Sequence, residues 1–263
     1  MSRVLPPGTL LQLSYLRERL EGIQPGRFVE VGPGEGEITH LLLELGWTGE
    51  SFDLDPHTIA DLHERFVPEI AANRYRPVHE DVLCLANRAA YADLVISCMV
   101  MEHMDDRAEP RFMHKAASLL RPGGRMIGLV PASPAHWGIE DDIAGHFRRY
   151  TREALHLLAA ATGWNVEHLS GLTYPLSNML LPASNHLVCR SEAHKLRLSA
   201  EERTRLSGRR SVKYKTYLPP ILGLLSNRYM LAPAHWLQKV CGDNRAALVL
   251  YFEARPAERR AAR

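Results

Sequence analysis

The stretch RFVEVGPGEGE, from Arg27 to Glu37, sets the organisation of the whole chain. Its first half is apolar apart from Glu30, and a segment with apolar periodicity follows Glu37. Between them stand three glycines, Gly32, Gly34 and Gly36. This order predicts a buried strand, a tight turn and the start of a helix. Because glycine accepts positive φ and has no Cβ, the turn can lie against a nucleotide-like cofactor and offer its backbone N–H groups.

The spacing of the glycines separates two classes of cofactor. A dinucleotide-binding turn has the pattern G-x-G-x-x-G, whereas this chain has G-x-G-x-G, with Glu37 where the third glycine would stand. The acid at the end of the strand, Glu30, would repel a pyrophosphate and suits a cation. With Glu30 followed by Gly32, Gly34 and Gly36, the stretch resembles the first motif of the class I S-adenosylmethionine-dependent methyltransferases, acid-x-Gly-x-Gly-x-Gly. The resemblance implies S-adenosylmethionine, a positively charged sulfonium, as the cofactor.

Length and composition favour one large α/β domain with an insertion. The chain has 263 residues, of which 46% are hydrophobic and 24% charged, as is ordinary for a globular protein. Its four cysteines form no C-x-x-C pair, which fits a reducing compartment. Charges between Arg17 and Glu21 are unlike a secretory signal, so we expect a cytoplasmic protein. The longest segment without Lys, Arg, Asp or Glu, from His168 to Cys189, contains two prolines, so no membrane span is expected.

The predicted elements alternate between strand and helix as far as Pro131, which indicates a doubly wound, mostly parallel sheet. Two further apolar strands, around Val166 to Leu169 and Ala246 to Ala254, make seven in all. In the class I fold that the chain resembles, the last strand is antiparallel, and here a mainly helical insertion precedes it. The expected organisation is an N-terminal helix over the cofactor pocket (1–24), a cofactor-binding core (25–173 and 244–256) and the insertion as a candidate substrate cap (174–243).

An acid at the end of the second strand is the candidate for ribose binding. A carboxylate about 20 residues after the first glycine reaches the ribose in folds of this kind, because it accepts two hydrogen bonds from a vicinal diol. Asp53 stands at that distance, and Asp55 is the alternative, although Asp55 is better placed to cap the helix that starts at Pro56. The family resemblance places the residue between them, Leu54, against the adenine ring.

The end of the third strand, expected over Tyr75 to His79, is the candidate for adenine recognition. In the family an acid here accepts a hydrogen bond from the adenine amino group, and the next backbone N–H donates to the ring. The resemblance assigns these roles to Asp81 and Val82. Glu80 replaces Asp81 if the strand is shifted by one residue.

The segment YADLVISCMVMEH, Tyr91 to His103, predicts a central strand because of its β-branched residues. It resembles the fourth strand of the family, in which Asp-x-Val is followed after a few residues by Glu-His. The resemblance places Cys98 and Met99 beside the methionine portion of the cofactor. Glu102 and His103 then begin the next loop, at the end of the strand where open α/β sheets bind ligands.

The segment from Ala132 to Thr151 is too long for a simple connection. Its ending, GHFRRYT, resembles a subgroup of these methyltransferases that is associated with small molecules and glycans. Either His146 and Tyr150 face the substrate, or the two arginines between them pair with Asp141 or Asp142 and pin the loop.

Two histidines, His103 and His146, are the candidates for a general base, because imidazole titrates near neutral pH. A base is needed only where the acceptor must lose a proton. The candidates for substrate contact are Trp137, Tyr150 and Tyr174. Acids with an amide or a histidine do not recur at ligand spacing, so no metal is expected and activity should survive a chelator; Asp141 and Asp142 keep a metal as the alternative.

The insertion has a basic part and an apolar part. From Arg190 to Lys215 it holds nine Lys and Arg against three Glu, and from Tyr217 to Val240 it is apolar and aromatic. Such segments are usually a solvated face and helices packed on their own domain. Together they would form either a cap that admits an anionic or partly apolar substrate, or a homodimer surface.

These features predict a methyltransferase that acts in line on the oxygen or nitrogen of a small molecule, with an anionic acceptor favoured. One alternative is an RNA methyltransferase that uses the basic run. Against it, the chain has neither the N-P-P-[YF] motif of amino-methylating enzymes nor the Pro-Cys nucleophile of cytosine-C5 enzymes, so nucleic acid is not the expected partner. The other alternative is a non-catalytic protein that binds S-adenosylmethionine.

Overall fold

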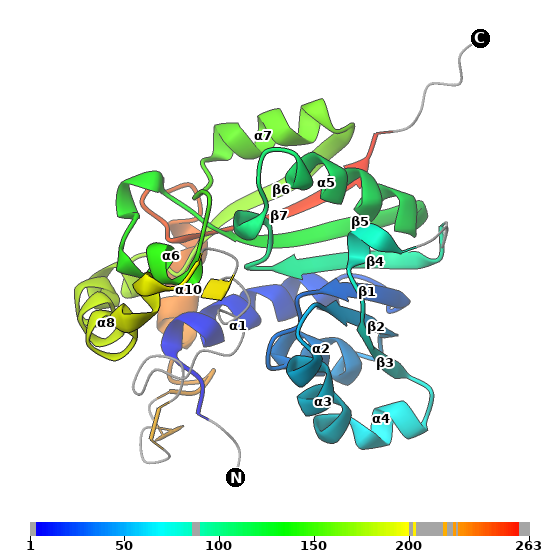
Figure 1. The fold of residues 1–263 in the computed structure, drawn as a ribbon, viewed down its shortest axis with the longest axis horizontal. Coiled ribbons are helices and arrows are strands. Elements are labelled where there is room, and N and C mark those ends of the chain that lie inside the picture. The colour runs from blue at the N-terminus through cyan, green and yellow to red at the C-terminus, as the bar shows by residue number, and fades with distance from the viewer. Residues whose placement is uncertain are drawn as a thin grey trace.

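A sheet with helices on both faces forms the frame of the protein (Figure 1). This computed structural model describes residues 4–85, 90–199, 202–203, 218–219, 223–224 and 226–257. The strands are β1 (Arg27–Val31), β2 (Thr48–Asp53), β3 (Tyr75–His79), β4 (Ala92–Cys98), β5 (Leu120–Pro131), β6 (Trp164–Leu172) and β7 (Val249–Pro256). The α-helices are α1 (Pro7–Glu21), α2 (Glu37–Glu44), α3 (Pro56–Arg65), α4 (Val67–Ala71), α5 (Ala108–Leu119), α6 (Ile139–Ala144), α7 (Arg152–Ala161), α8 (Leu176–Glu192) and α10 (Ala232–Val240). The short 3₁₀ segments are η1 (Val82–Cys84), η2 (Met101–His103), η3 (Pro134–His136) and η4 (Ala193–Arg197).

The order of the strands places the switch point of the sheet between β1 and β4. Within the described residues the order is β3-β2-β1-β4-β5-β7-β6. The first five strands pair in parallel, and β7 runs antiparallel to both β5 and β6. The predicted doubly wound sheet with an antiparallel last strand is therefore confirmed. Because the connections leave β1 and β4 toward opposite edges, a crevice remains at the carboxyl ends of these strands.

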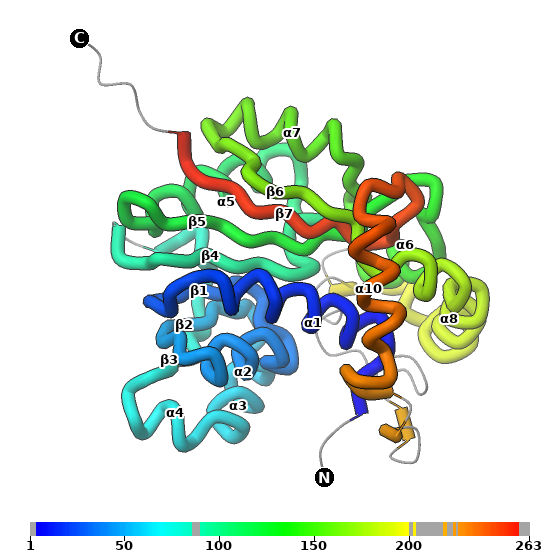
Figure 2. Tube along the Cα trace, turned by 180° about the vertical axis from the view of Figure 1, so that it is seen from behind, coloured from blue at the N-terminus to red at the C-terminus, as the bar shows by residue number. Residues whose placement is uncertain are grey.

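The two faces of the sheet bury separate apolar clusters. Alternation along β1 sends Val29 and Val31 to the face covered by α5 and α7, while Phe28 points to the face covered by α1, α2 and α3. Figures 1 and 2 show these layers from opposite sides. Because both faces are covered, the strands are apolar almost throughout, and removal of this surface from water stabilises the fold.

The segment between β6 and β7 is the predicted insertion, and its described part is mainly helical. Helix α8 packs against α6, and α10 packs against α1 and β6 (Figure 2). Most of the predicted basic run falls outside the described residues, which omit 204–217. In the ranges that the structure describes, no helix combines the length and the apolar character needed to cross a bilayer.

The segment from 132 to 151, predicted as a loop, contains the short elements η3 and α6. Asp141 Oδ2 accepts a hydrogen bond from the Gly138 N–H (2.9 Å) at the start of α6, and Gly145 ends the helix with a φ of 74°. The sequence did not reveal α6, because six residues are too few to show a helical period.

Helix α1 is anchored to the sheet by Glu253 of β7. The Glu253 side chain is 2% exposed, and its Oε1 accepts hydrogen bonds from Arg19 Nε (2.6 Å) and from the Tyr251 hydroxyl (2.8 Å). Burial alone would raise the pKa of Glu253, but the bonds from Arg19 and Tyr251 lower it. Leu16 and Leu20 of the same helix are buried against the sheet. The network thus joins the N-terminal helix to the last strand of the chain.

We expect Glu253→Gln to lower the free energy of unfolding by ~1–3 kcal/mol, because the amide keeps the size of the side chain but removes the charged partner of Arg19. Urea unfolding measures this change. Glu167→Gln is the matched control, because Glu167 of β6 pairs with Arg255 of β7 at the surface. The side chains of Glu167 and Arg255 are 43% and 33% exposed. Its effect should stay within about 1 kcal/mol. Equal effects of the two variants would mean that the buried network adds no more than a surface pair.

Candidate cofactor and active site

A cavity of about 1340 Å³ lies at the carboxyl ends of β1, β2, β4 and β5. The loop after β3 adds to its wall, and residues of α1 and α8 contribute further walls. This volume exceeds the ~300–1,000 Å³ of a typical single-ligand pocket. The cavity therefore has room for a cofactor and a second small molecule.

The three glycines of the turn all have positive φ, but the space around them differs. The φ angles of Gly32, Gly34 and Gly36 are 69°, 53° and 80°. A Cβ on Gly32 would lie 2.4 Å from Val100, and one on Gly36 would lie 2.7 Å from both Leu62 and Phe66. A Cβ on Gly34 would meet no atom within 4 Å, and Gly34 lines the cavity. Neighbouring side chains therefore leave no room for a Cβ at Gly32 or Gly36, whereas a Cβ at Gly34 would face open space.

Substitution by alanine at two of these positions should give opposite results. Gly34→Ala should weaken S-adenosylmethionine binding by roughly tenfold or more while the protein stays folded, because the new methyl group projects into the cavity where a cofactor would approach the backbone. Gly36→Ala carries the same positive-φ penalty of ~1–2 kcal/mol but adds a clash with α3, so it should cost ~1–3 kcal/mol more in urea unfolding. Unchanged calorimetric affinity in Gly34→Ala would remove this residue from the cofactor site.

Glu30, the acid before the turn, is buried, and its hydrogen bonds connect β1 to α2 and β2. It is 2% exposed, and its Oε2 accepts hydrogen bonds from the hydroxyl groups of Thr39 on α2 (2.5 Å) and Ser51 on β2 (2.7 Å). Burial, with a smaller contribution from the charge of Asp53, raises the pKa of Glu30, and the two hydroxyl groups oppose this, so that the pKa lies at about 7. A cation in the cavity would therefore favour the charged form of Glu30 near neutral pH.

If the cofactor cation lies beside Glu30, the affinity of the protein for S-adenosylmethionine should rise with pH. Below the pKa of about 7, Glu30 carries a proton that a bound cation disfavours, so S-adenosylmethionine should bind up to roughly eightfold more tightly at pH 7.5 than at pH 6. In Glu30→Gln this contribution is lost. The α-amino group of the ligand titrates near ~7.7–8.0 with either protein, so the difference between the two calorimetric profiles isolates Glu30. Parallel profiles would place the cation elsewhere.

The structure places both predicted residues of β2 at the cavity. Asp53 and Leu54 line it, and the Leu54 side chain is 65% exposed, as an apolar surface for a ring would be. Asp53 Oδ1 accepts a hydrogen bond from the Asp55 N–H (2.8 Å), and burial raises the pKa of Asp53. Asp55 caps α3 by accepting from the His57 N–H (3.1 Å). The capping role therefore belongs to Asp55, and Asp53 stays the candidate for the ribose.

Both alternatives after β3 also reach the cavity. Glu80, Asp81 and Val82 line it, and Val82 is buried. Asp81 Oδ1 accepts a hydrogen bond from the Leu83 N–H (2.9 Å) and so caps η1. The choice between Glu80 and Asp81 for the adenine amino group thus stays open.

Strand β4 ends at the cavity with Cys98 and Met99. Met99 has a positive φ of 54°, and its N–H donates to the Leu129 carbonyl group of β5 (2.8 Å). Burial raises the pKa of the Cys98 thiol, which therefore stays neutral. The chain turns at Met99 into η2, which carries Glu102 and His103.

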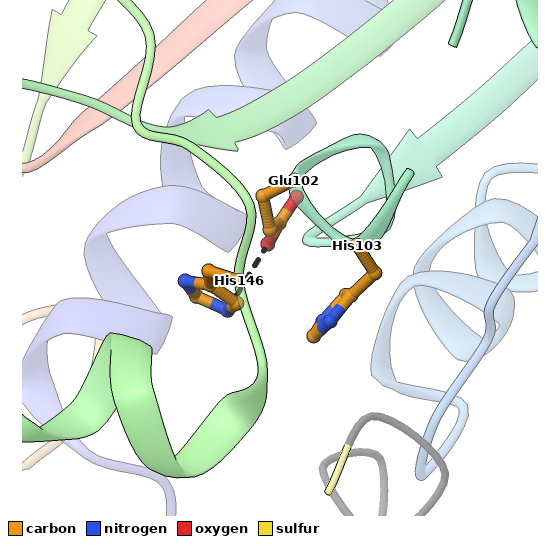
Figure 3. Close-up of side chains that lie close together, drawn as sticks. All are labelled: Glu102, His103 and His146. Carbon is orange, nitrogen blue, oxygen red and sulfur yellow. Dashed lines mark ion pairs between the residues drawn. The ribbon is translucent and has the colours of Figure 1, made fainter. Parts of the chain in front are cut away.

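Glu102 and His103 meet His146, which comes from the segment between α6 and α7 (Figure 3). One nitrogen or oxygen atom from each of the three side chains lies within 4.8 Å of the other two. The two imidazole rings are 4.8 Å apart between centroids in an edge-to-face arrangement, and His146 Nε2 is 3.9 Å from Glu102 Oε1. All three residues line the cavity. The fold therefore brings together the two histidines proposed as bases and adds a carboxyl group.

His146 is held in place by Asp141 of α6. His146 Nδ1 lies 2.8 Å from Asp141 Oδ1, which places the proton on Nδ1 and the lone pair on Nε2. The same carboxylate accepts from Arg149 Nε (2.8 Å). Burial on its own would raise the pKa of Asp141, but the bonds from His146 and Arg149 lower it, so Asp141 stays charged. Arg149 thus pairs with Asp141 as predicted, whereas Arg148 pairs with Asp106 and Glu109 instead. His146 lines the cavity, and contact with a substrate stays a prediction.

Burial changes the ionisation of the other two members of the cluster. It raises the pKa of Glu102 to about 8, with a further contribution from the charge of Asp141. Burial, together with the proximity of His146, lowers the pKa of His103 to about 3. At neutral pH Glu102 is therefore mainly protonated and His103 is uncharged.

The three aromatic residues proposed for substrate contact do not line the cavity. Tyr150 is buried in the core, and its hydroxyl group donates to Glu109. Trp137 is 41% exposed, and its Nε1 donates to Asp142 (2.9 Å). Tyr174 also lies outside the lining. The side chains of Tyr150 and Trp137 hold the loop together, a role that the sequence does not distinguish from substrate contact.

Two helices contribute lining residues that no motif indicated. They are Gln12 and Leu13 of α1 and Leu180, Ser184 and Leu187 of α8. Helix α8 belongs to the insertion, so at least this part of the proposed cap borders the cavity. The sequence predicted that the N-terminal helix and the insertion would cover the cavity, but not which of their residues would line it, because that depends on how α8 packs against α6.

The described lining of the cavity is acidic. It includes ten Asp and Glu residues and one arginine, Arg149, whose guanidinium group is paired with Asp141. Acidic walls attract cations and repel anions. This part of the cavity therefore suits a cationic ligand and does not support the anionic acceptor expected from the basic run.

Comparison with known proteins indicates the same class of protein. Residues 9–169 match the family described as the methyltransferase domain. A curated relative, the chloroplastic ribosomal RNA small subunit methyltransferase of Arabidopsis thaliana, is 28% identical over 99 residues. That match covers 37% of this chain and only 24% of the relative, about a quarter of its length.

Solved structures share the fold at low sequence identity. A putative sarcosine dimethylglycine methyltransferase from Galdieria sulphuraria has a TM-score of 0.59 at 14% identity, with 95% of this chain and 85% of that chain covered. The 1,6-didemethyltoxoflavin-N1-methyltransferase of Burkholderia thailandensis, solved with S-adenosylhomocysteine, has a TM-score of 0.52 at 22% identity, with 64% and 73% covered. Magnesium protoporphyrin IX methyltransferase of Synechocystis PCC 6803 has a TM-score of 0.53 at 16% identity, with 63% and 77% covered. At these identities the comparison shows a shared fold and no more.

Proposed function

Because the chain belongs to the class I S-adenosylmethionine-dependent methyltransferases, whose methyltransferase domain matches residues 9–169, we propose that it transfers the methyl group of S-adenosylmethionine to a small molecule. The observation that supports this most directly is the open space at Gly34, beside the buried acid Glu30 and at the switch point of the sheet. Because no described side chain packs against Gly34, its backbone is open to close approach of a ligand from the cavity.

The candidate cofactor residues follow the carboxyl edge of the sheet in order. In this proposal Asp53 at the end of β2 and either Asp81 or Glu80 after β3 hold adenosine, while Glu30 and Cys98 lie at the ends of β1 and β4. Neighbouring strands are ~4.8 Å apart, so these four strand ends span the length of an extended nucleoside with an amino-acid tail. Glu102 and the two histidines lie beyond them, where an acceptor would meet the sulfonium.

Methyl transfer needs position more than chemical activation. The cofactor supplies a methyl group on a positively charged sulfur: the acceptor lone pair forms the new bond while the S–C bond breaks and its electrons stay on sulfur. Holding two molecules at reacting distance contributes up to ~7–11 kcal/mol. Where the acceptor must also lose a proton, His146 Nε2 and His103 are the proposed bases, and such proton transfer adds ~10²- to 10⁴-fold. Both border the cavity, and the lowered pKa of His103, about 3, makes it the weaker base of the two.

We propose that the acceptor lies between the histidines and α8. The cavity is large enough for a second small molecule, and Leu180, Ser184 and Leu187 form its wall on the side of the insertion. The anionic acceptor remains a proposal that rests on the basic run, most of which lies outside the described residues. A cytoplasmic location and a homodimer likewise stay predictions.

RNA methylation is the second candidate function. Two observations favour it: the basic run, and the partial match to a chloroplastic ribosomal RNA methyltransferase. The acidic lining opposes it, because phosphates would approach ten carboxyl groups at the cavity. A protein that binds the cofactor without turnover is the third candidate.

Incubation with methyl-labelled S-adenosylmethionine separates these candidates. The purified protein is offered either a small-metabolite extract or total RNA, and Gly34→Ala measures the background. Label in the metabolite fraction alone supports the proposal, and label in RNA alone contradicts it. No label in either fraction, with cofactor binding intact by calorimetry, would favour the non-catalytic protein.

Ser184→Trp tests the position of the acceptor. The indole would fill space beside α8, so label transfer should be lost while S-adenosylmethionine affinity stays within several-fold of the wild type. His186→Trp, on the exposed side of the same helix, is the matched control and should keep transfer. Loss of cofactor affinity in Ser184→Trp would mean that α8 borders the cofactor instead of the acceptor.

A further inference from the structure

The carboxyl group of Glu102 is buried without a donor. Glu102 is 0% exposed, and no other residue in the described part of the chain donates a hydrogen bond to its Oε1 or Oε2. Nδ1 of His103 is buried and equally without a partner among the described residues. Buried polar atoms of this kind are rare in native proteins and call for an explanation, such as a missing ion. None of the proposed cofactor contacts uses these atoms.

Both histidines of the cluster are oriented through their other ring nitrogen. Asp141 accepts a hydrogen bond from His146 Nδ1, which leaves the Nε2 lone pair 3.9 Å from Glu102 Oε1. The backbone of Gly145 accepts a hydrogen bond from the His103 ring. Because His103 Nδ1 has no described partner, that bond comes from Nε2 and leaves the lone pair on Nδ1. Histidines that bind metals are typically held in this way, by a carboxylate or a backbone carbonyl group.

We propose that Glu102, His103 and His146 bind one divalent transition-metal ion. The proposed donor atoms are a carboxylate oxygen of Glu102, Nδ1 of His103 and Nε2 of His146. One nitrogen or oxygen atom of each of these side chains lies within 4.8 Å of the other two. Zn²⁺ binds such atoms at about 2.0–2.2 Å, so two ligands of one tetrahedral ion lie ~3.3–3.6 Å apart. Binding of the ion would therefore require side-chain rotations that bring the three donor atoms closer together. Two imidazoles and one carboxylate favour Zn²⁺ over Mg²⁺ or Ca²⁺, which prefer oxygen.

The surroundings favour a cation at this position. The described lining holds ten acidic residues, and Asp141 adds a carboxylate behind His146. Three protein ligands leave at least one coordination position free for another molecule. If the proposed function holds, that molecule is the acceptor, bound through a hydroxyl or carboxylate oxygen. A bound hydroxyl group would lose its proton to solvent more readily, because the ion stabilises the resulting oxyanion, and the histidines would then act as ligands instead of bases.

This proposal reverses the expectation that activity survives a chelator. That expectation rested on ligand spacing along the chain, where Glu102 and His103 are adjacent but His146 is far away. Only the fold brings His146 to η2 (Figure 3).

Calorimetric titration of the full chain with ZnCl₂, after chelator treatment and dialysis, tests the site without cofactor or acceptor. We expect one Zn²⁺ per chain and weaker binding of MgCl₂. Three variants each replace one strong ligand by a neutral amide, which binds Zn²⁺ more weakly: Glu102→Gln, His103→Gln and His146→Asn. The new amide of His146→Asn can still donate to Asp141, and that of His103→Gln to Gly145. Each variant should weaken Zn²⁺ binding by about tenfold or more, whereas His63→Ala, an exposed histidine on α3, should not.

Absence of stoichiometric Zn²⁺ binding by the wild type would overturn the proposal, as would folded Glu102→Gln and His146→Asn variants that bind like the wild type. If the variants unfold by circular dichroism, CoCl₂ added to the wild type decides, since Co²⁺ takes the same ligands as Zn²⁺. The paramagnetic ion should shift or broaden the imidazole NMR signals of His103 and His146 and spare those of His63. Unchanged signals, or equal effects on all histidines, would contradict the site.

The outcomes for metal and for methyl transfer are separate. Zn²⁺ binding is measured without S-adenosylmethionine, so its failure leaves the result of the labelling experiment unaffected. Zn²⁺ binding with no transfer to any fraction would instead keep the metal site and overturn the proposed function. If Zn²⁺ binding and methyl transfer are both observed, chelator treatment should lower the rate of methyl transfer, and ZnCl₂ should restore it.

Discussion

The buried carboxyl group of Glu30 is the constraint on which the cofactor side of the protein depends. It stands at the end of β1, beside the switch point of the sheet, and hydroxyl groups from α2 and β2 reach it from both sides. The bond from Thr39 connects the strand before the glycine turn to the helix after it, and the bond from Ser51 connects the same carboxyl group to β2, so the turn has little freedom to move. An acid held in this way faces a cavity without losing its partners, and a cationic ligand would stabilise its charge.

Glu30 at the end of β1 and Glu102 after β4 differ in their hydrogen-bond partners, and this difference distinguishes two parts of the cavity. Glu30 accepts two hydrogen bonds, whereas Glu102 has no donor among the described residues although it is as deeply buried. Burial of an unpartnered carboxyl group is unfavourable unless something else satisfies it. A sulfonium beside Glu30 and a metal ion beside Glu102 would each supply positive charge to the acid that needs it. The two halves of the cavity would then hold the donor and the acceptor of one reaction.

The walls of the cavity come from parts of the chain that are far apart in sequence. Strand ends supply one side, and the N-terminal helix α1 and the inserted helix α8 supply others. Helix α1 is held by Arg19 on Glu253 of β7, and α8 packs on α6, the helix that also carries Asp141. The position of His146 and the wall for the acceptor thus depend on the same short helix.

The sequence by itself determined the sheet and its cofactor edge. Apolar strands, helical periods and the glycine turn are local patterns. Each acid of that edge lies within two residues of the end of its strand, so Asp53 and Asp81 could be proposed from spacing and family resemblance. Only the tertiary structure decided which glycine faces open space, because Gly34 and Gly36 look alike in sequence while α3 covers only Gly36. The same holds for the acceptor side. The short helix α6 has no visible period. The side chains of Tyr150 and Trp137 lie outside the lining of the cavity and donate hydrogen bonds to Glu109 and Asp142. The meeting of Glu102, His103 and His146 depends on contacts between distant segments that no local pattern encodes.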